Sequence, residues 1–457
     1  MFKKIYIFLF INNEKNNFLK KILNNYFFEK KFIFLRSINN KFTNYEFKKI
    51  INDARDQKKS KINIELLTRQ IVISKIIGIV FFKKLIFSKE KQTSLIYPLP
   101  NAYIKILKNE KIKVFSFACS FLWLLFILLQ YIETLIFFIK LLFKKKYNNK
   151  NNFSEKLPDS IYFAGLTEKN FPTKISKSKS YNIFEWYCNI YKDTKYIYHS
   201  VIENKYQNYK INKTNICYGE LIPYLKFKKK IIFISKSLYY IILTLLTFFL
   251  GKWWNVLVLK DKIIDLSFRL SDNQNLHSKY LFNNTMIKYR PLWTKTLEEK
   301  GAEIIMYFYS ASDEPICPIT KESTFSKNFA NANWPYYFCW DEYHASEIKK
   351  IKHSQNSKLI INGPVYFEAN KDNLSNLPKK YIVLFDAEPH DVKNFIGIGT
   401  YQDVGYAIES VGVKVIRQML FDTLKIAKIL NISVVHKPKR DIFNKRTKAY
   451  KKLLKDL

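Results

Sequence analysis

The sequence predicts an α/β fold of two Rossmann-like halves, the second incomplete, together with two long apolar membrane-associated helices. Unbroken apolar runs alternate with helical segments, which is the pattern of parallel strands that are buried on both faces. The clearest such unit lies at residues 381–440. Two segments, 114–139 and 231–250, are also long and apolar enough for a bilayer, which needs about 20 residues.

The length of 457 residues allows at least two cores, because single domains rarely exceed about 250–300 residues. In chain order, we expect an N-terminal mixed region (1–110), an apolar helix with a basic flank (111–148), the first part of an N-terminal α/β domain (149–230), a second apolar helix (231–259), the remainder of that α/β domain (260–375) and the start of an incomplete C-terminal Rossmann-like domain (381–457).

The N-terminal region carries no recognisable chemistry. Ile5 to Ile11 is an apolar run behind two lysines, but residues 12–15 lack the small-residue cleavage site of a signal peptide. We therefore expect a first buried strand there, followed by a helix over residues 63–87.

The net charge of +39 would usually indicate a nucleic acid or an anionic membrane as partner. Of the 77 basic residues, however, 69 are lysine and 8 are arginine, amid abundant Asn, Ile, Phe and Tyr. Proteins that read nucleic acids favour arginine, whose planar fork matches bases and phosphates. We expect no nucleic-acid partner.

The five cysteines, Cys119, Cys188, Cys217, Cys317 and Cys339, are widely spaced. An odd, scattered set disfavours a disulfide framework and a clustered zinc site. We expect a reducing compartment, no metal and no resident cofactor. The sequence also lacks a G-x-S-x-G elbow, a Walker loop and a paired H-x-x-x-H motif, so hydrolase, P-loop and zinc-protease functions have no support.

Gln130 and Glu133 interrupt the first apolar segment, and Trp253 and Trp254 follow the second at the place of an interfacial aromatic belt. Two spanning helices would place the strand at Ile161 across the membrane from later strands of its sheet. We therefore expect both helices to dip into one leaflet or to lie in the interface of an anionic membrane, with lysines reaching the phosphates. Burial of both helices within the protein is the alternative.

A regular α/β pattern begins after a polar linker at 140–158. We expect helices at 181–191 and 291–300, and strands at the apolar runs that begin at Ile161, Ala302, Trp334 and Lys358, followed by a hinge near residues 370–380. These strands should be mostly parallel.

Residues 381–440 read as a strand (381–385), a helix (411–429) and a second strand (432–435). Asp386 and Glu388 follow the first strand, and His436, Lys437, Lys439 and Arg440 close the second. Strands joined by a right-handed crossover usually lie side by side, so their carboxyl ends meet where open α/β sheets bind ligands. The basic group could hold a donor phosphate, and the carboxylates, with His390, could act as a general base.

Each motif also has a structural interpretation. The basic turn can be a solvated surface feature, and Asp386 and Glu388 can cap a helix or pair with that turn. Gly397 and Gly399 fit a simple loop better than a phosphate-binding one. Asp341 and Glu342 fit the first turn of a helix.

Several segments together resemble the bacterial PFTS-motif polysaccharide biosynthesis proteins, over roughly residues 158–451. The resemblance rests on these motifs: Arg290-Pro291-Leu292-Trp293-Thr294, Tyr307-Phe308-Tyr309-Ser310, Asn333-Trp334-Pro335, Trp340-Asp341-Glu342-Tyr343, Ile361-Asn362-Gly363-Pro364, Leu384-Phe385-Asp386 with Pro389, and Lys437-Pro438-Lys439-Arg440. It implies a transferase of surface-carbohydrate synthesis with a GT-B-like fold.

The tetrapeptide Pro-Phe-Thr-Ser that names the family is absent from these 457 residues. We therefore expect a chain truncated before that motif, with its activity in doubt.

The leading hypothesis is a membrane-associated glycosyltransferase on the cytoplasmic face of the inner membrane. It would use a nucleotide-activated sugar and a glycan or lipid-linked acceptor. The alternative is a non-catalytic, membrane-bound polysaccharide assembly protein.

Overall fold

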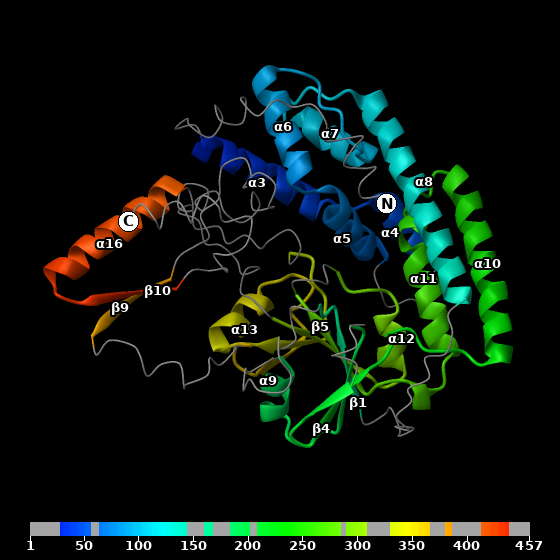
Figure 1. Cartoon of the computed structure of the whole chain (residues 1–457). Helices are drawn as coiled ribbons and strands as arrows, with labels where there is room; N and C mark the ends of the chain where they lie inside the picture. Colours follow the sequence, from blue (N-terminus) through cyan, green and yellow to red (C-terminus); the bar gives the residue numbers. More distant parts are fainter. Residues whose placement is uncertain are drawn as a thin grey trace. The chain divides into compact units, whose positions relative to one another are not determined.

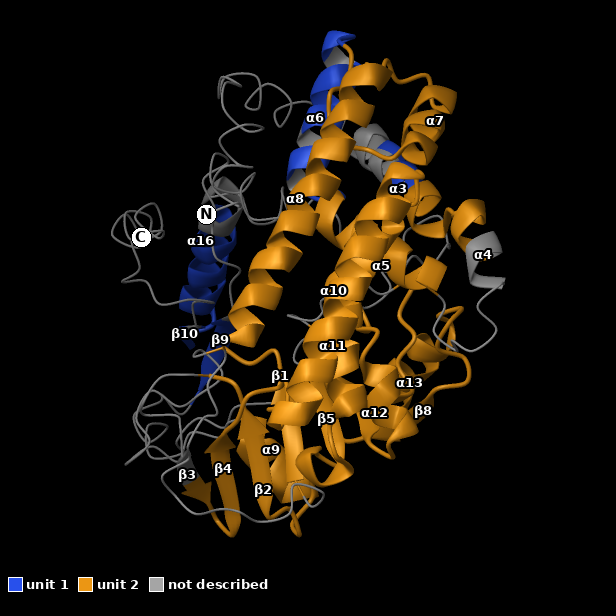
Figure 2. Ribbon diagram, turned by 90° about the vertical axis from the view of Figure 1, so that its right-hand side faces the viewer, with its two compact units in different colours: residues 1–39, 77–93, 371–457 blue, residues 40–76, 94–370 orange. Residues whose placement is uncertain are grey.

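The structure is a computed structural model that describes residues 28–55, 64–143, 160–167, 183–201, 208–284, 289–308, 330–365, 380–385 and 413–437. The chain divides into two compact units (Figure 2). Unit 1 comprises residues 1–39, 77–93 and 371–457, and unit 2 comprises residues 40–76 and 94–370. The strand expected at residues 5–11 and the hinge near 370–380 lie largely outside the described residues.

Unit 2 contains an eight-stranded sheet with the order β3-β4-β2-β1-β5-β6-β7-β8. All its neighbouring strands are parallel except β3 and β4. The expected mostly parallel sheet is therefore confirmed. The strands are β1 (Ser160–Ala164), β2 (Tyr196–His199), β3 (Asn208–Ile211), β4 (Thr214–Tyr218), β5 (Lys279–Asn283), β6 (Glu303–Tyr307), β7 (Tyr336–Cys339) and β8 (Lys358–Ile361).

Helices cover both faces of this sheet, which explains its unbroken apolar strands. Helix α9 (Ile183–Ile190) packs on the face that carries Ile161 and Phe163 of β1. Helices α11 (Trp254–Leu270), α12 (Thr294–Glu299) and α13 (Glu342–Lys349) contribute to the core on the opposite face, with Tyr162 and Ala164. The period of two along β1 thus divides its side chains between two cores.

The N-terminal part of the described chain is helical. Its helices are α3 (Phe28–Asn44), α4 (Lys48–Arg55), α5 (Ile64–Ile76), α6 (Ile79–Lys91) and α7 (Asn101–Asn109). The single helix predicted over residues 63–87 was wrong, because α5 ends at Ile76 and α6 starts at Ile79. Gly78 occupies the break in extended backbone, where it precedes α6.

The two apolar segments form α8 (Ser116–Leu142) and α10 (Phe227–Phe249), as predicted. They run antiparallel on one flank of unit 2 (Figure 1). Phe138 of α8 packs on Phe233 with ring centroids 6.2 Å apart, and the Tyr131 hydroxyl donates to the Ile241 carbonyl at 3.1 Å. Helix α11 packs against both helices and so attaches them to the α/β body.

In unit 1, strands β9 (Tyr381–Phe385) and β10 (Ser433–Lys437) form a parallel pair, and helix α16 (Val413–Ile429) precedes β10. This is the strand, helix and adjacent parallel strand expected from the sequence. The GT-B-like organisation as a whole stays a prediction.

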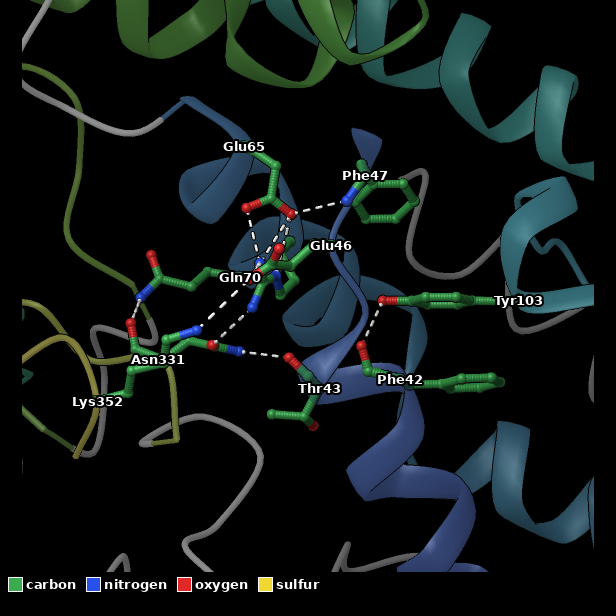
Figure 3. Close-up of polar contacts among 10 residues, drawn as sticks. Phe42, Thr43, Glu46, Phe47, Glu65, Gln70, Tyr103, Asn331 and Lys352 are labelled. Atoms are coloured by element: carbon green, nitrogen blue, oxygen red, sulfur yellow. Dashed lines mark hydrogen bonds and ion pairs between the residues drawn. The ribbon is translucent and has the colours of Figure 1, made fainter. Parts of the chain in front are cut away.

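A buried ion pair connects the N-terminal helices to the sheet within unit 2 (Figure 3). Arg69 donates to both carboxylate oxygens of Glu65, with Nη2 2.7 Å from Oε2 and Nε 3.1 Å from Oε1. Glu65 also accepts from the Phe47 backbone N–H at 3.0 Å. Arg69 Nη1 donates to Asn331 ahead of β7 at 3.3 Å, and Asn331 donates to the Thr43 carbonyl at 3.1 Å. One network therefore joins α3, α5 and the segment leading into β7.

We expect Glu65→Gln to lower the stability of unit 2 by about 3–5 kcal/mol, because it leaves the buried Arg69 guanidinium with only the more distant and half-exposed Glu46 as a counter-charge, 3.9 Å away. Both side chains are under 5% exposed. Urea unfolding in neutral detergent would measure the loss.

The matched control is Glu299→Gln, which breaks the more exposed Lys295–Glu299 pair on α12. Exposed pairs contribute about 0–1 kcal/mol. Equal losses in the two variants would show that the Glu65–Arg69 pair has no special weight.

Candidate functional site

The order of the large sheet places a switch point at β1, which pairs with β2 on one side and with β5 on the other. The chain leaves β1 toward β2 and later returns to the opposite side of β1 in β5. In open α/β sheets, ligands bind outside the carboxyl ends of the strands at such a point. The carboxyl ends of β1 and β5 are therefore the first candidate site.

A glycine turn and two buried asparagines lie at this edge of the sheet. Gly165 follows β1 with a φ of +75°, a left-handed conformation that glycine adopts without strain. Asn283 ends β5 and Asn284 follows it, and the two residues are 1% and 2% exposed. The Asn284 N–H donates to the Tyr307 carbonyl at 3.2 Å. Buried amides at this edge can orient a polar ligand.

The end of β7 meets the start of α13. Asp341 is the N-cap of this helix, and its carboxylate accepts from the His344 N–H at 2.7 Å. The expected structural role of Asp341 is therefore confirmed. The Trp340 backbone N–H donates to His344 Nδ1 at 3.2 Å, which places the imidazole hydrogen on Nε2. Burial lowers the pKa of His344 and keeps it neutral.

The predicted site at residues 381–440 is described only in part. Lys437 pairs with Phe385, and His436 pairs with Leu384, in the β9–β10 register. The two strand ends therefore lie side by side, as predicted. Asp386, Glu388, Lys439 and Arg440, together with His390 and Gly397, lie outside the described residues, and their roles stay predictions.

Two buried carboxylates on α11 were missed by the sequence analysis. Asp261 accepts from the Leu292 N–H at 3.0 Å, and Asp265 accepts from the Thr296 hydroxyl and, at 2.6 Å, from Arg269 Nε. Burial raises the pKa of Asp261 to about 6, against the opposing effect of the Leu292 hydrogen bond. Asp261 and Asp265, spaced four apart among the apolar residues of the helix, were the available signal.

Asp261 fixes a segment that carries one of the motifs of the resemblance, Arg290 to Thr294. Arg290 in turn donates to the Asn333 carbonyl at 3.1 Å and pairs with Glu298. Trp293 stacks on Phe268 of α11, with ring centroids 5.1 Å apart. These motif residues therefore connect α11, α12 and the segment before β7, which is a structural role.

Helices α8 and α10 form the second candidate site, an exposed apolar surface that we call the apolar face. Only 33% and 22% of their most apolar stretches are buried, whereas the core helix of a soluble protein is mostly buried. The alternative of burial within the protein is therefore wrong for this structure. The large exposed side chains of the face are Phe117, Phe121, Leu124, Leu125, Leu128, Ile132, Ile136 and Ile139 of α8, and Phe227, Ile231, Ile232, Leu238, Tyr239, Ile242, Leu243, Leu246 and Phe249 of α10.

The polar residues of α8 turn toward the protein body. Gln130 accepts from Lys75 of α5, and Glu133 lies 3.8 Å from Lys260 of α11. The expected aromatic belt was wrong for Trp254, which is 6% exposed, and Trp253 packs on Trp123 at 5.0 Å. These tryptophans pack together where α8, α10 and α11 meet.

The two apolar helices suggest an association with membranes.

The described residues contain no cluster of three or more His, Cys, Asp or Glu side chains that could hold a metal ion.

Comparison with known proteins confirms the resemblance over residues 242–457, which match the family model described as "Polysaccharide biosynthesis PFTS motif protein". All the motif segments named above fall within this range. The match starts later than the resemblance predicted from residue 158, and the expected truncation before the motif is not borne out. No curated protein and no solved structure matches the chain.

We expect Asp261→Asn to change how stability depends on pH. The folded-state pKa of about 6 lies above the unfolded value of 3.8, so Asp261 contributes stability below pH 3.8 that is lost as the pH rises through 6. Between pH 5 and pH 7 the wild type should lose about 1–2 kcal/mol more than the variant, at 1.36 kcal/mol per pKa unit.

Urea titrations at both pH values measure this difference. Asp272→Asn is the control, because the Asp272 side chain is 46% exposed and the hydrogen bond from Lys229 lowers its pKa. Parallel stability curves for the wild type and Asp261→Asn would contradict the assignment.

Proposed function

From the family match over residues 242–457, we propose that this protein is a membrane-attached glycosyltransferase of surface polysaccharide synthesis. The match, which suggests a polysaccharide biosynthesis protein, is the observation that carries the proposal. The parallel sheet supports it, since such sheets bind nucleotide ligands at the carboxyl ends of their strands.

The donor in this proposal is a nucleotide-activated sugar. Lys437, with Lys439 and Arg440 three residues or fewer beyond it, would neutralise the donor diphosphate as it leaves. Asp386 and Glu388 follow the neighbouring strand, and one of them would take the proton of the acceptor hydroxyl. The register of Lys437 with Phe385 supports a shared location for the two groups.

The apolar face would attach the protein to one leaflet of the inner membrane, on the cytoplasmic side where nucleotide sugars are made. Lys75, Glu133 and Lys260 lie beside the middle of α8. In a spanning orientation they would sit at the depth of the hydrocarbon centre, where charged side chains are costly. With both helices in the plane of the leaflet, these charges remain on the water side, and Lys236 of α10 can snorkel to the phosphates.

A transfer assay tests the proposal. Membranes that contain the protein are incubated with a panel of radiolabelled nucleotide sugars, and the label is followed into the lipid extract. We expect incorporation from at least one donor, and a loss of about 10²–10⁴-fold in Asp386→Asn or Glu388→Gln, because a general base contributes that much. Unchanged transfer in both variants, or none from any donor, would contradict the proposed activity.

Donor binding should depend on the basic group formed by Lys437, at the end of β10, with Lys439 and Arg440 beyond it in the sequence. We expect Lys437→Ala and Arg440→Ala each to weaken nucleotide-sugar binding by about 10-fold or more, because a hydrogen bond to a charged group contributes about 1.5–3 kcal/mol. Lys213→Ala, in the β3–β4 turn, removes the same charge elsewhere and is the control. Unchanged affinity in Lys437→Ala and Arg440→Ala would reduce the basic group to a solvated surface feature.

Attachment should depend on the apolar face. Ile242 and Leu246 of α10 are each 58% exposed. We expect Ile242→Glu with Leu246→Glu to lower binding to phosphatidylglycerol vesicles at least about 10-fold, because each large apolar side chain contributes about 1.5–3 kcal/mol on burial.

Lys213→Glu with Lys349→Glu is the control for that experiment, since it changes the net charge more but lies off the apolar face. If the control lost as much binding as the face variant, attachment would be electrostatic adsorption without insertion.

A further inference from the structure

A small cavity lies where the end of α8 meets the start of α10. Its volume is about 30 Å³, and apolar side chains, among them Leu141, Leu142 and Phe233, form much of its lining. Lys230, one turn into α10, adds a cation to the lining. Leu142 and Lys230 are half-buried, so the lining reaches the protein surface. We call it the end cavity.

The surroundings of the end cavity are strongly basic. Lys226 and Lys228 are exposed, and Lys229 and Lys230 are half-buried. Asp272 pairs with Lys229, and the hydrogen bond from Lys229, with the charges of Lys226 and Lys300, lowers the Asp272 pKa. One carboxylate thus faces several ammonium groups. Helix α10 also starts without an acidic residue in its first turn, so its positive dipole end adds to this field.

The apolar face continues directly from the end cavity. Phe227 and Ile231, in the first turns of α10, are 78% and 53% exposed. A ligand that fits both features carries a phosphate and a hydrocarbon chain. Free phosphate would leave the apolar lining unfilled, and a neutral lipid would leave the lysines without a counter-charge.

We propose that the end cavity binds the phosphate end of a phosphorylated lipid. The phosphate contacts Lys230 and Lys228, and the first part of the chain packs on Leu142 and Phe233. With a volume of only about 30 Å³, the end cavity seats no more than a short length of chain. The remainder of the chain runs over the apolar face into the leaflet.

This inference deepens the proposed function and rests on it for its biological meaning: the acceptor belongs to the class of lipid-linked phosphates, presented at the membrane surface. The binding itself needs neither donor nor transfer. It can therefore fail while the transfer assay succeeds, and the reverse.

The experiment titrates the full chain, in neutral detergent, with dioleoyl phosphatidate and separately with dioleoyl phosphatidylcholine, followed by native mass spectrometry. We expect one phosphatidate per protein, bound at least 10-fold more tightly than phosphatidylcholine. Lys230→Gln should weaken phosphatidate binding about 5-fold or more, and Leu142→Glu at least 10-fold, because it adds a carboxylate to the apolar lining. Lys213→Gln, which loses the same charge as Lys230→Gln, should bind as the wild type does.

Inorganic phosphate at 100-fold excess over the lipid distinguishes the two sources of a phosphate group. The proposal predicts that it does not displace phosphatidate. Displacement by inorganic phosphate would show a simple anion site and overturn the proposal. So would equal affinity for the two lipids, or unchanged phosphatidate binding in Lys230→Gln and Leu142→Glu, provided that circular dichroism shows both variants folded.

Discussion

Helix α11 has to satisfy two different surroundings at once, and the arrangement of unit 2 depends on how it does so. Leu259, Ile263 and Leu266 pack with α8 and α10, while Ile264 and Phe268 belong to the core of the sheet. Asp261 and Asp265, both under 10% exposed, anchor the segment that starts α12. An apolar helix without these acids could pack on the helices but would not fix that segment.

The double packing of α11 links the apolar face to the sheet. Because α11 runs back along α10, the chain returns to the sheet in β5, beside β1, after leaving it for the apolar helices. Strands β1 to β4 lie between α8 and α10 in the sequence, and β5 to β8 follow α11, yet all share one sheet. The sequence argument that both helices cannot cross overlooked this returning helix. The case against crossing now rests on the charged residues beside the middle of α8.

Long apolar elements were predictable, and short or mixed ones were not. The runs at β1, β6 and β7 stand out because burial on both faces removes polar residues. The runs at β8 to β10 and in the two apolar helices also stand out as apolar, although these elements are partly exposed. Strand β2 has four residues and β5 ends in asparagine, so neither shows that pattern. Helix α11 carries two buried acids, which in the sequence resemble the residues of a solvent-exposed face. The domain boundary that we predicted between residues 259 and 260 falls inside this helix. At the candidate site, the adjacency of β9 and β10 could be predicted from crossover topology. The contacts of Arg290 and Asp261 could not, because they depend on tertiary packing that a local sequence pattern does not encode.

The central claim is that the α/β body and the N-terminal helices lie on one side of a membrane, with α8 and α10 in a single leaflet. Single cysteines at Lys105, Lys213 and Lys349, exposed positions before α8, between α8 and α10, and after α11, test it most directly in a background that lacks the native cysteines. The chain is expressed in a bacterial host, and intact spheroplasts are treated with a membrane-impermeant maleimide before and after lysis. The account predicts that all three positions react only after lysis. Labelling of Lys105→Cys in intact spheroplasts, with Lys213→Cys protected, would show that α8 crosses the membrane and would contradict it.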